Sequence, residues 1–322
     1  MRRRVFIAVL CGAAAWPIAA RAQAVRRIGI LMASEERDPE MRARVTAFQD
    51  AMRALGWTEG SNVRMDIRWS GGSSERAETY AKEIAALNPD VIVAHATVGI
   101  EAVLKTTRGV PTVFLAVGNP VGTGVVPGMS QPGANVTGFS AFEPEITGRW
   151  MQVLKEIAPG TQHIGILSYP GYEFLLEKAE AAAAAFSVAV QITTVRNAAE
   201  IEQAVAAIGA RPGGALIVLP APVLASNREL LARLAASQRL PAVYPFRFYV
   251  ASGGLMSYGF DVVDIFKRGA RYVDRVLRGE KPGDLPVQAP TKFELVINLK
   301  AARALGLRVS EAMLAQADEV LE

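Results

Sequence analysis

The sequence predicts an α/β protein made of two similar doubly wound lobes, each built on a parallel sheet. Short β-rich runs alternate with longer amphipathic helical patterns, which is typical of βαβ units. Three strand-like segments of the first half also return, in the same order, in the second half. The pairs are 28–31 and 164–167, 90–93 and 215–218, and 110–113 and 240–243. A helical pattern separates the segments in both halves, so the shared order favours duplication over chance similarity of buried strands.

The first half shows the alternation most clearly. Residues 27–32 form an apolar run that is typical of a buried strand. In residues 41–55 the apolar side chains recur at the three- and four-residue spacings of a helix. Residues 63–69 alternate apolar and polar side chains, which predicts a strand with one exposed face. The remaining elements predicted for this half are a helix over 74–87 and strands over 91–94 and 112–115.

The first 24 residues have the features of a secretory signal peptide. Three arginines at residues 2–4 are followed by an apolar stretch over residues 5–20 and a small-x-small site at residues 22–24. We predict cleavage after Ala24 and a periplasmic protein. The longest strongly apolar run lies in this leader, so no membrane span is predicted in the mature chain.

Charge and cysteine content exclude several classes of function. The sequence carries 35 Lys and Arg against 31 Asp and Glu, and four of the basic residues but no acid lie in the leader. The mature chain is therefore formally neutral, which gives no electrostatic reason to expect a nucleic acid or an anionic membrane as partner. The only cysteine, Cys11, also lies in the leader, so the mature chain has no disulfide and no cysteine nucleophile. Lipidation of Cys11 is disfavoured because the bulky Leu10 precedes it.

The residues that follow the predicted strands are small or carry hydroxyl groups, and acids and bases are scarce among them. They lie at 33–34, 95–97, 117–120, 168–169 and 220–222. In open α/β sheets, ligands bind beyond the carboxyl ends of the strands. This composition suits the binding of a small polar molecule better than acid–base catalysis.

Motifs for catalysis and for cofactors are absent from the sequence. It has no Gly-x-Ser-x-Gly elbow, no Walker phosphate loop and no His-Glu-x-x-His, and its glycines lack dinucleotide-binding spacing. His95 follows a buried strand and could face a cleft, but one histidine without a second ligand nearby is a poor metal site. We therefore predict a protein that is not an enzyme and that needs no cofactor or metal.

Paired carboxylates leave hydrolysis open as an alternative. The pairs are Glu35 with Glu36, Glu143 with Glu145, and Asp261 with Asp264. The last pair is better explained as the cap of a helix over residues 261–278, because Asp satisfies free amide donors there. Exposed first turns of helices are the simpler explanation for the glutamates.

Two aromatic clusters have two interpretations each. One comprises residues 244–249 around Arg247, and the other consists of Tyr169 and Tyr172. They are either a buried strand with its turn or a crossover whose side chains face a cleft. In the second case Arg247 would hold a carboxylate and the rings would stack on a planar ligand.

Seven further segments carry a resemblance through their order along the chain. They are 48–62 (FQDAMRALGWTEGSN), 87–94 (LNPDVIVA), 131–140 (QPGANVTGFS), 253–261 (GGLMSYGFD), 283–287 (GDLPV), 291–306 (TKFELVINLKAARALG) and 317–320 (ADEV). Together they resemble the substrate-binding proteins of ABC transporters, and in particular the members that bind tryptophan and other aromatic amino acids. The resemblance covers nearly the whole mature chain.

The resemblance implies a periplasmic binding protein of type I, in which two α/β lobes joined by three crossovers close on a ligand. The crossovers are expected near residues 138–142, 244–247 and 287–291. Lobe one would then comprise 25–139 and 246–287, and lobe two 140–245 and 288–322.

Two positions depart from the pattern of the family. Asn119 stands before Pro120 and Val121 where family members often carry Asp. This change removes a partner for a ligand ammonium group and favours an acid without an amino group. Ser310 and Glu311 replace the usual Pro-Pro before the last helix, which changes only the start of that helix.

We expect the ligand to contact both lobes. Thr97 would begin a helix whose free amide donors make a carboxylate site. Asp261 could accept a hydrogen bond from an ammonium or hydroxyl group. The predicted ligand-binding residues are Ser34, His95, Thr97, Asn119, Ser140, Tyr169, Ala221, Arg247, Tyr258 and Asp261.

The predicted function is that of a solute receptor of an ABC importer. It would capture a small carboxylate-bearing solute, either an amino acid or an aromatic or other organic acid, by hinge closure. The expected partners are a membrane permease and its ATPase, and the receptor itself is expected to be a monomer. The alternatives are a sensory ligand-binding protein of the same fold and a secreted hydrolase with paired carboxylates.

Overall fold

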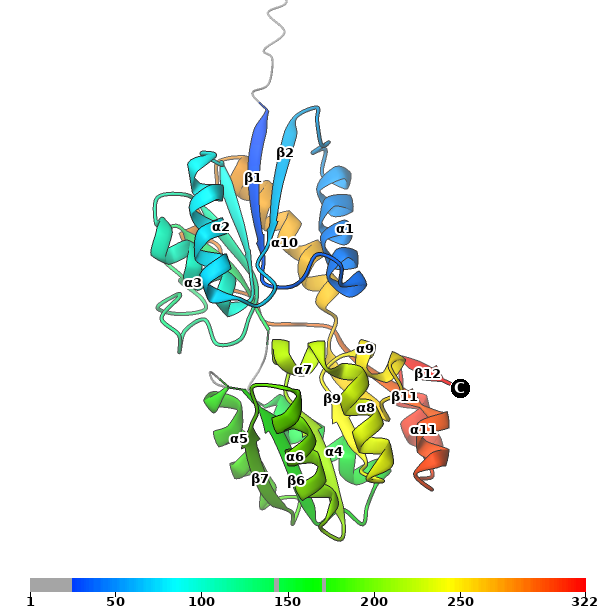
Figure 1. The fold of residues 1–322 in the computed structure, drawn as a ribbon. Helices are drawn as coiled ribbons and strands as arrows, with labels where there is room; N and C mark the ends of the chain where they lie inside the picture. Colours follow the sequence, from blue (N-terminus) through cyan, green and yellow to red (C-terminus); the bar gives the residue numbers. More distant parts are fainter. Residues whose placement is uncertain (1–24, 142–144, 170–171) are drawn as a thin grey trace, which may run out of the picture.

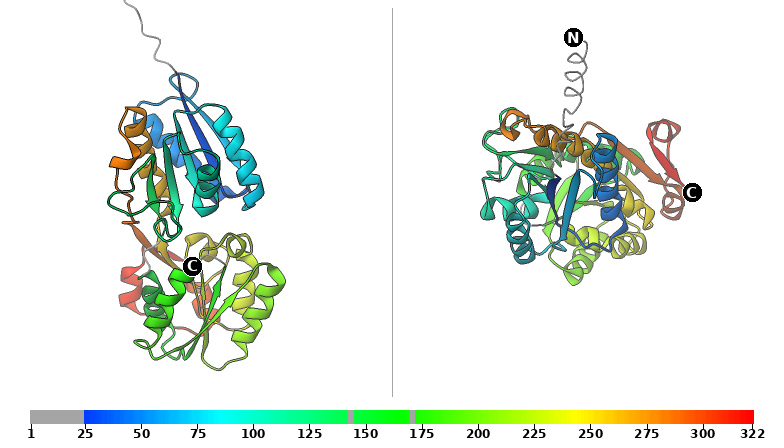
Figure 2. Two further views of the ribbon diagram at one scale, coloured as in Figure 1. Left: turned by 90° about the vertical axis from the view of Figure 1, so that its left-hand side faces the viewer. Right: turned by 90° about the horizontal axis from the view of Figure 1, so that it is seen from above.

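Two lobes, each with its own β-sheet, make up the molecule (Figure 1). The structure, a computed structural model, describes residues 25–141, 145–169 and 172–322. The predicted leader with its cleavage site after Ala24 lies outside the described residues, and so do Phe142 and Glu143. The views of Figure 2 show the lobes stacked along the long axis of the molecule.

Lobe one is built on a five-stranded parallel sheet with the strand order β2-β1-β3-β4-β5. Its strands are β1 (Arg26–Met32), β2 (Val63–Trp69), β3 (Val91–His95), β4 (Thr112–Val117) and β5 (Val136–Ser140). Its helices are α1 (Pro39–Ala54), α2 (Ser74–Ala86), α3 (Ala96–Thr106) and α10 (Val262–Leu277), followed by the short 3₁₀ helix η1 (Pro282–Asp284).

Apolar side chains along the strands point alternately to the two faces of this sheet, and helices cover both faces. Ile30 packs in the same cluster as the apolar residues of α1 and α10, whereas its neighbour Leu31 packs with those of α2 and α3. Successive side chains of a strand point to opposite faces, so this sheet is covered on both sides. The lobe is therefore doubly wound, as the sequence predicts.

Lobe two is built on a seven-stranded sheet with the order β12-β11-β10-β9-β8-β6-β7. Its strands are β6 (His163–Ser168), β7 (Ala189–Thr194), β8 (Gly214–Val218), β9 (Ala242–Tyr244), β10 (Met256–Phe260), β11 (Phe293–Asn298) and β12 (Glu319–Leu321). Strands β6 to β10 are parallel, whereas β11 pairs antiparallel with β10 and β12 follows β11 in parallel. Its helices are α4 (Ile146–Ile157), α5 (Glu173–Ala183), α6 (Ala198–Gly209), α7 (Pro222–Ser226), α8 (Arg228–Ser237), α9 (Arg247–Ala251), α11 (Leu299–Ala304) and α12 (Glu311–Gln316).

The two sheets repeat one strand order. The order β2-β1-β3-β4-β5 of lobe one matches β7-β6-β8-β9-β10 of lobe two, so the paired segments seen in the sequence occupy equivalent strands. Gly29 on β1 and Gly165 on β6 also have the same environment. A Cβ atom on Gly29 would lie 2.2 Å from a methyl carbon of Ile84, and one on Gly165 would lie 2.1 Å from a methyl carbon of Ile208. In both lobes a glycine therefore lets a helix approach the first strand of the repeat.

Helix α1 illustrates how local signals define the elements. Asp38 accepts a hydrogen bond from the Glu40 amide at 3.0 Å and Pro39 occupies the first turn, which together start the helix. The buried side chains Val45 and Phe48 then follow the helical spacing noted in the sequence. The helix predicted over residues 41–55 is confirmed, with its start two residues earlier than the apolar pattern.

The chain passes between the lobes three times along its described length, and one passage differs from the expectation. The expected crossover at residues 244–247 is wrong, because β10 pairs with β9 and β11 in the second sheet and the chain leaves that sheet at Asp261. Residues 246–260 therefore belong to lobe two. The aromatic run and Pro245 resembled a linker because β9 has only 3 residues and is followed at once by the short helix α9.

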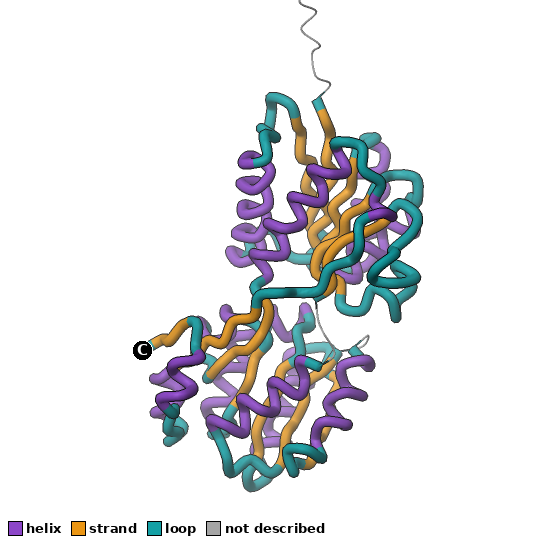
Figure 3. Tube along the Cα trace, turned by 180° about the vertical axis from the view of Figure 1, so that it is seen from behind, coloured by secondary structure: helices purple, strands orange, loops and turns teal. Residues whose placement is uncertain are grey.

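The described parts of the three connections meet at the hinge between the lobes (Figure 3). Gln288 donates its amide to Gly138 O at 3.0 Å and accepts the Ser140 amide at 2.9 Å. The Asp261 amide donates to Lys292 O at 3.0 Å, and Lys292 Nζ lies 2.8 Å from Asp261 Oδ2. These contacts join the first and second connections to the third.

We predict that Gly165 and Ile208 are energetically coupled. Gly165→Ala should lower the free energy of unfolding by about 1–3 kcal/mol, because the new methyl overpacks the interface between β6 and α6. Ile208→Ala alone should cost about 2–5 kcal/mol through the cavity that it creates. The double variant should be at least about 1 kcal/mol more stable than additivity predicts. Urea denaturation of the four proteins measures this coupling, and strict additivity would contradict the contact.

Candidate ligand site

A cavity of about 180 Å³ lies between the two lobes, at the carboxyl ends of strands from both sheets. Lobe one contributes the residues after β1, β3 and β4 together with the start of α1. Lobe two contributes residues 220–222 after β8 and the aromatic residues around α9. This is the position at which α/β sheets bind ligands, and the two lobes contribute its walls jointly.

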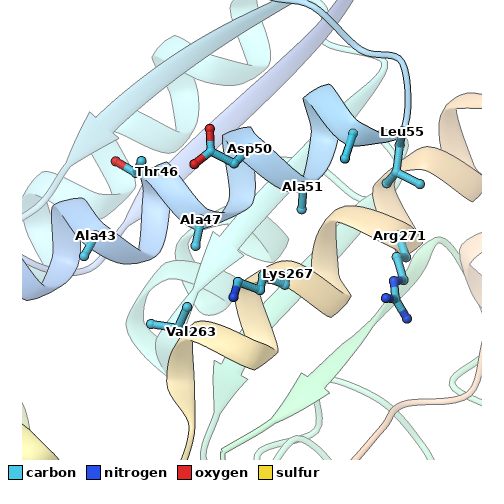
Figure 4. Close-up of a pocket in the computed structure, with 10 residues that line it drawn as sticks. Ala43, Thr46, Ala47, Asp50, Ala51, Leu55, Val263, Lys267 and Arg271 are labelled. Atoms are coloured by element: carbon cyan, nitrogen blue, oxygen red, sulfur yellow. The ribbon is translucent and has the colours of Figure 1, made fainter.

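A larger groove of about 610 Å³ lies elsewhere, between α1 and α10 (Figure 4). Four alanines of α1 line it together with the charged residues Asp50, Lys267 and Arg271. All of its lining residues come from lobe one. Buried polar groups such as the Ser34 hydroxyl and the His95 imidazole line the cavity between the lobes, and this groove has none of them. We therefore take the smaller cavity, between the lobes, as the candidate site.

Four of the residues predicted from the sequence line this cavity. They are Ser34, His95, Thr97 and Ala221. Ser34 follows β1, His95 is the last residue of β3, Thr97 lies in the first turn of α3, and Ala221 follows β8 of lobe two. The Ser34 hydroxyl is buried without a hydrogen-bond partner among the described residues. The structure therefore brings together residues that the sequence placed after separate strands.

Three other predicted residues lie at or near the hinge, outside the cavity lining. Asn119 Oδ1 accepts the Gly122 amide at 2.9 Å within the loop that follows β4. Ser140 Oγ donates to the carbonyl oxygen of Gln288 at 3.5 Å. Asp261 caps α10 by accepting the Asp264 amide at 3.0 Å, which confirms the capping interpretation of that carboxylate pair.

Three more predicted residues belong to lobe two and lie outside the cavity lining. Arg247 forms a two-pronged ion pair with Glu319, at 2.5 and 2.6 Å. Tyr258 stacks on Phe293 with ring centroids 5.8 Å apart. Tyr169 is 36% exposed and does not line the cavity.

Both interpretations of the aromatic clusters hold in part. Tyr244 belongs to the buried strand β9, whereas Phe246 and Phe248 line the cavity. Arg247 lies between these two rings in the sequence and faces the other way. In the second cluster Tyr172 lines the cavity, and its hydroxyl donates to Pro220 O at 2.7 Å.

Arg44 is a buried cation of the cavity that the sequence analysis missed. Its side chain reaches the cavity from α1 and the residue is only 6% exposed. Burial lowers the pKa of its guanidinium to about 10, so the group remains a cation at neutral pH. No carboxylate of the described residues lies within ion-pair distance of it; Nη1 lies 3.3 Å from Met41 Sδ. A signal existed, because Arg44 occupies the buried face of a helix that is otherwise apolar there.

The Arg44 guanidinium also connects the lobes. Its Cζ atom lies 5.8 Å from the ring centroid of Phe246, which belongs to lobe two. A second contact across the cavity joins Arg228 Nη1 of lobe two to Asp38 Oδ2 of lobe one at 3.7 Å. Charged groups at the cavity therefore form contacts that depend on how closely the lobes approach.

His95 is held neutral beside this cation. It is 7% exposed, and its Nδ1 atom is buried without a partner among the described residues. Burial lowers the pKa of its imidazole to about 3, and the positive charge of Arg44 contributes in the same direction. The ring packs on Phe266 at 5.6 Å.

The backbone at the cavity is strained at two alanines. Ala96 has φ +61° and Ala116 has φ +58°, a left-handed conformation that is unfavourable for residues with a Cβ atom. Both alanines line the cavity, at the ends of β3 and β4. No side chain caps the first turn of α3, whose amides begin at Ala96. Strain of this kind is retained where it shapes a functional site.

We predict that His95 makes stability depend on pH. Below pH 6.5 the unfolded chain takes up a proton that the native imidazole, with a pKa of about 3, does not. The free energy of unfolding should therefore fall by about 2 kcal/mol more in the wild type than in His95→Gln between pH 7 and pH 5. Denaturant titrations of both proteins at each pH test this, and parallel pH profiles would contradict the buried neutral state.

Comparison with known proteins identifies the family. A family model described as ABC transporter substrate binding protein matches residues 28–321. A tyrosine-binding protein of Clostridioides difficile (strain R20291) is 23% identical over 289 residues, which cover 88% of this chain and 81% of that protein.

Solved structures agree with this match. A conserved domain protein of Vibrio cholerae O1 biovar El Tor is 31% identical, with a TM-score of 0.86, over 92% of this chain and 99% of its own. An ABC domain from Streptococcus pneumonia in complex with L-Trp is 26% identical, with a TM-score of 0.85, over the same shares of the two chains. The fold is that of the type I periplasmic binding proteins, and the relatives whose role is known bind substrates and are not enzymes. The chain belongs to the family of ABC transporter substrate-binding proteins.

Proposed function

We propose that this protein is the extracytoplasmic receptor of an ABC importer and that it captures a small carboxylate-bearing solute between its lobes. The observation that carries the proposal is the buried guanidinium of Arg44 in the cavity. A buried cation without a carboxylate partner is unfavourable unless a bound anion compensates its charge. Arginine is also suited to hold a carboxylate through two parallel hydrogen bonds.

Other groups of the cavity support an anionic ligand end. The uncapped first turn of α3 presents amide donors, and the Thr97 side chain lines the cavity beside them. The positive end of a helix dipole favours negative charge at this position. Ser34 adds a buried hydroxyl that can donate. These donors all belong to lobe one, so the carboxylate would bind that lobe first.

Lobe two supports an apolar or aromatic ligand body. Phe246, Phe248 and Tyr172 face the cavity from this lobe. Aromatic walls favour stacked or edge-to-face contact with a planar group. A solute with a carboxylate at one end and a ring at the other would therefore contact both lobes and favour their closed arrangement.

The paired carboxylates do not converge as a hydrolase would require. Asp261 is not among the lining residues of the cavity, because it caps α10 and pairs with Lys292. Glu35 lines the cavity edge, where it pairs with Arg76 at 3.4 Å. Glu143 lies outside the described residues. A binding function therefore accounts for the described site better than paired-carboxylate catalysis.

The predicted leader supports a periplasmic location, and the family supports a permease and an ATPase as partners. Among the described residues, no helix is long and apolar enough to cross a membrane. Within the same residues no cluster of metal-ligating side chains was found.

Arg44→Met tests the proposed carboxylate anchor. In a thermal-shift screen with aromatic acids, short aliphatic acids and amino acids, carboxylates should raise the Tm of the wild type by mass action. Arg44→Met should lose this shift, with affinity reduced at least a hundredfold, because the cation is removed. Its Tm without ligand should stay the same or rise, since a buried charge is replaced by a thioether chain. Arg53→Met on the exposed side of the same helix is the matched control, and equal shifts in all three proteins would refute the anchor.

Thr97→Val tests the contribution of α3. The substitution keeps the side-chain shape and removes the hydroxyl, so carboxylate affinity should fall about tenfold while the amide donors remain. Isothermal titration with the acid that gives the largest thermal shift provides the affinities. An unchanged affinity would exclude Thr97 from the site.

A further inference from the structure

We propose that this cavity selects single-ring carboxylic acids that lack an α-ammonium group and discriminates against the corresponding amino acids. The inference rests on the proposed function and specifies its class of solute. It is carried by the charges of the cavity, by its volume and by the guanidinium groups on its aromatic walls.

The cavity offers a free cation for the ligand but no free carboxylate. Among its described lining residues the acids are Glu35 and Asp38. Both oxygens of Asp38 are engaged, Oδ1 with the Glu40 amide at 3.0 Å and Oδ2 with Arg228 at 3.7 Å. Glu35 is more than half exposed and pairs with Arg76. The Arg44 guanidinium, in contrast, has no carboxylate partner within ion-pair distance among the described residues.

Other groups of the cavity that could attract an ammonium group are occupied as well, apart from the uncharged Ser34 hydroxyl and His95 Nδ1. Aromatic faces attract cations, but Arg44 lies over Phe246 and Arg228 lies 5.7 Å from the ring centroid of Phe248. The carbonyl oxygen of Pro220 accepts the Tyr172 hydroxyl. An ammonium group would therefore lose its hydration without gaining a charged partner, and it would lie in the field of two guanidinium groups.

The volume limits the ligand body to one ring. A cavity of about 150 Å³ in another protein holds benzene, and this cavity of about 180 Å³ is slightly larger. One ring with a short carboxylate arm fits such a space, whereas an indole with the same arm exceeds it. The tyrosine-binding relative and the relative solved with L-Trp hold amino acids, so the proposal sets this chain apart from them.

Matched ligands isolate the effect of the ammonium group on affinity from the effects of the ring and of the carboxylate. 3-Phenylpropanoate and L-phenylalanine differ only in the α-ammonium group, and 3-phenylpropanamide removes the negative charge instead. By isothermal titration of the purified protein, we expect 3-phenylpropanoate to bind at least tenfold more tightly than L-phenylalanine, the amide or indole-3-propanoate. Tighter binding of L-phenylalanine would overturn the inference and leave the carboxylate receptor intact. Binding of none of these acids, together with no thermal shift from any carboxylate, would overturn the proposed function as well.

A variant should reverse the selectivity by releasing Asp38. In Arg228→Met the Asp38 carboxylate loses its cationic partner and becomes available to an ammonium group. The ratio of the Kd of L-phenylalanine to that of 3-phenylpropanoate should therefore fall at least fivefold. Adding Asp38→Asn, which keeps the cap of α1, should restore the original ratio. Arg233→Met on the exposed side of α8 should leave it unchanged. An equal ratio in wild type and Arg228→Met would show that the ion pair does not govern selectivity, and would refute this account.

Discussion

The close passage of three chain segments at the hinge is the constraint on which the rest of the molecule depends. Gln288 bonds to Gly138 and Ser140, and Asp261 bonds to Lys292, so the connections are held against one another. Arg268 of α10 extends this network by donating to Thr291 Oγ1 at 3.0 Å and to the side chain of Gln288. Each connection leaves or enters a sheet at the edge formed by the carboxyl ends of its parallel strands. These edges of the two sheets must therefore face each other. The cavity follows from that geometry.

The buried cation and the uncapped amide donors of this cavity belong to lobe one. The cation of Arg44 is buried in lobe one, the nearby imidazole of His95 is neutral, and no side chain caps the first turn of α3, whose residues Ala96 and Thr97 line the cavity. Donors that are fixed before the ligand arrives lose little entropy when it binds. Lobe two adds mainly rings, whose contact with the ligand depends on approach of the lobes. In the proposed function, lobe one would therefore bind the anionic end of the solute, and lobe two would respond by closing on it.

Local signals in the sequence were sufficient to predict most of the fold and three of the lobe-one residues that line the cavity. The repeated strand segments predicted the shared sheet order, and residues that follow buried strands, such as His95 and Thr97, reached the cavity as expected. Strand β10 was assigned to the wrong lobe because a three-residue β9 leaves almost no periodic pattern. Arg44 was missed because helical periodicity is counted on apolar side chains, so a cation on the buried face does not enter the count. Arg247 was predicted to bind ligand because the sequence does not reveal which way a five-residue helix turns its side chains.

The absence of cysteine from the described chain gives the approach of the lobes an experimental use. Cys11 is the only cysteine of the 322 residues and lies in the predicted leader. Pro222 stands at the rim of lobe two, and a methyl group on Gly72 of lobe one would lie 3.9 Å from its Cβ atom. A thiol introduced by Pro222→Cys would thus be a unique attachment point for an environment-sensitive dye. The fluorescence of this dye would report changes in the distance between the lobes. The protein could therefore serve as an optical sensor of its own solute.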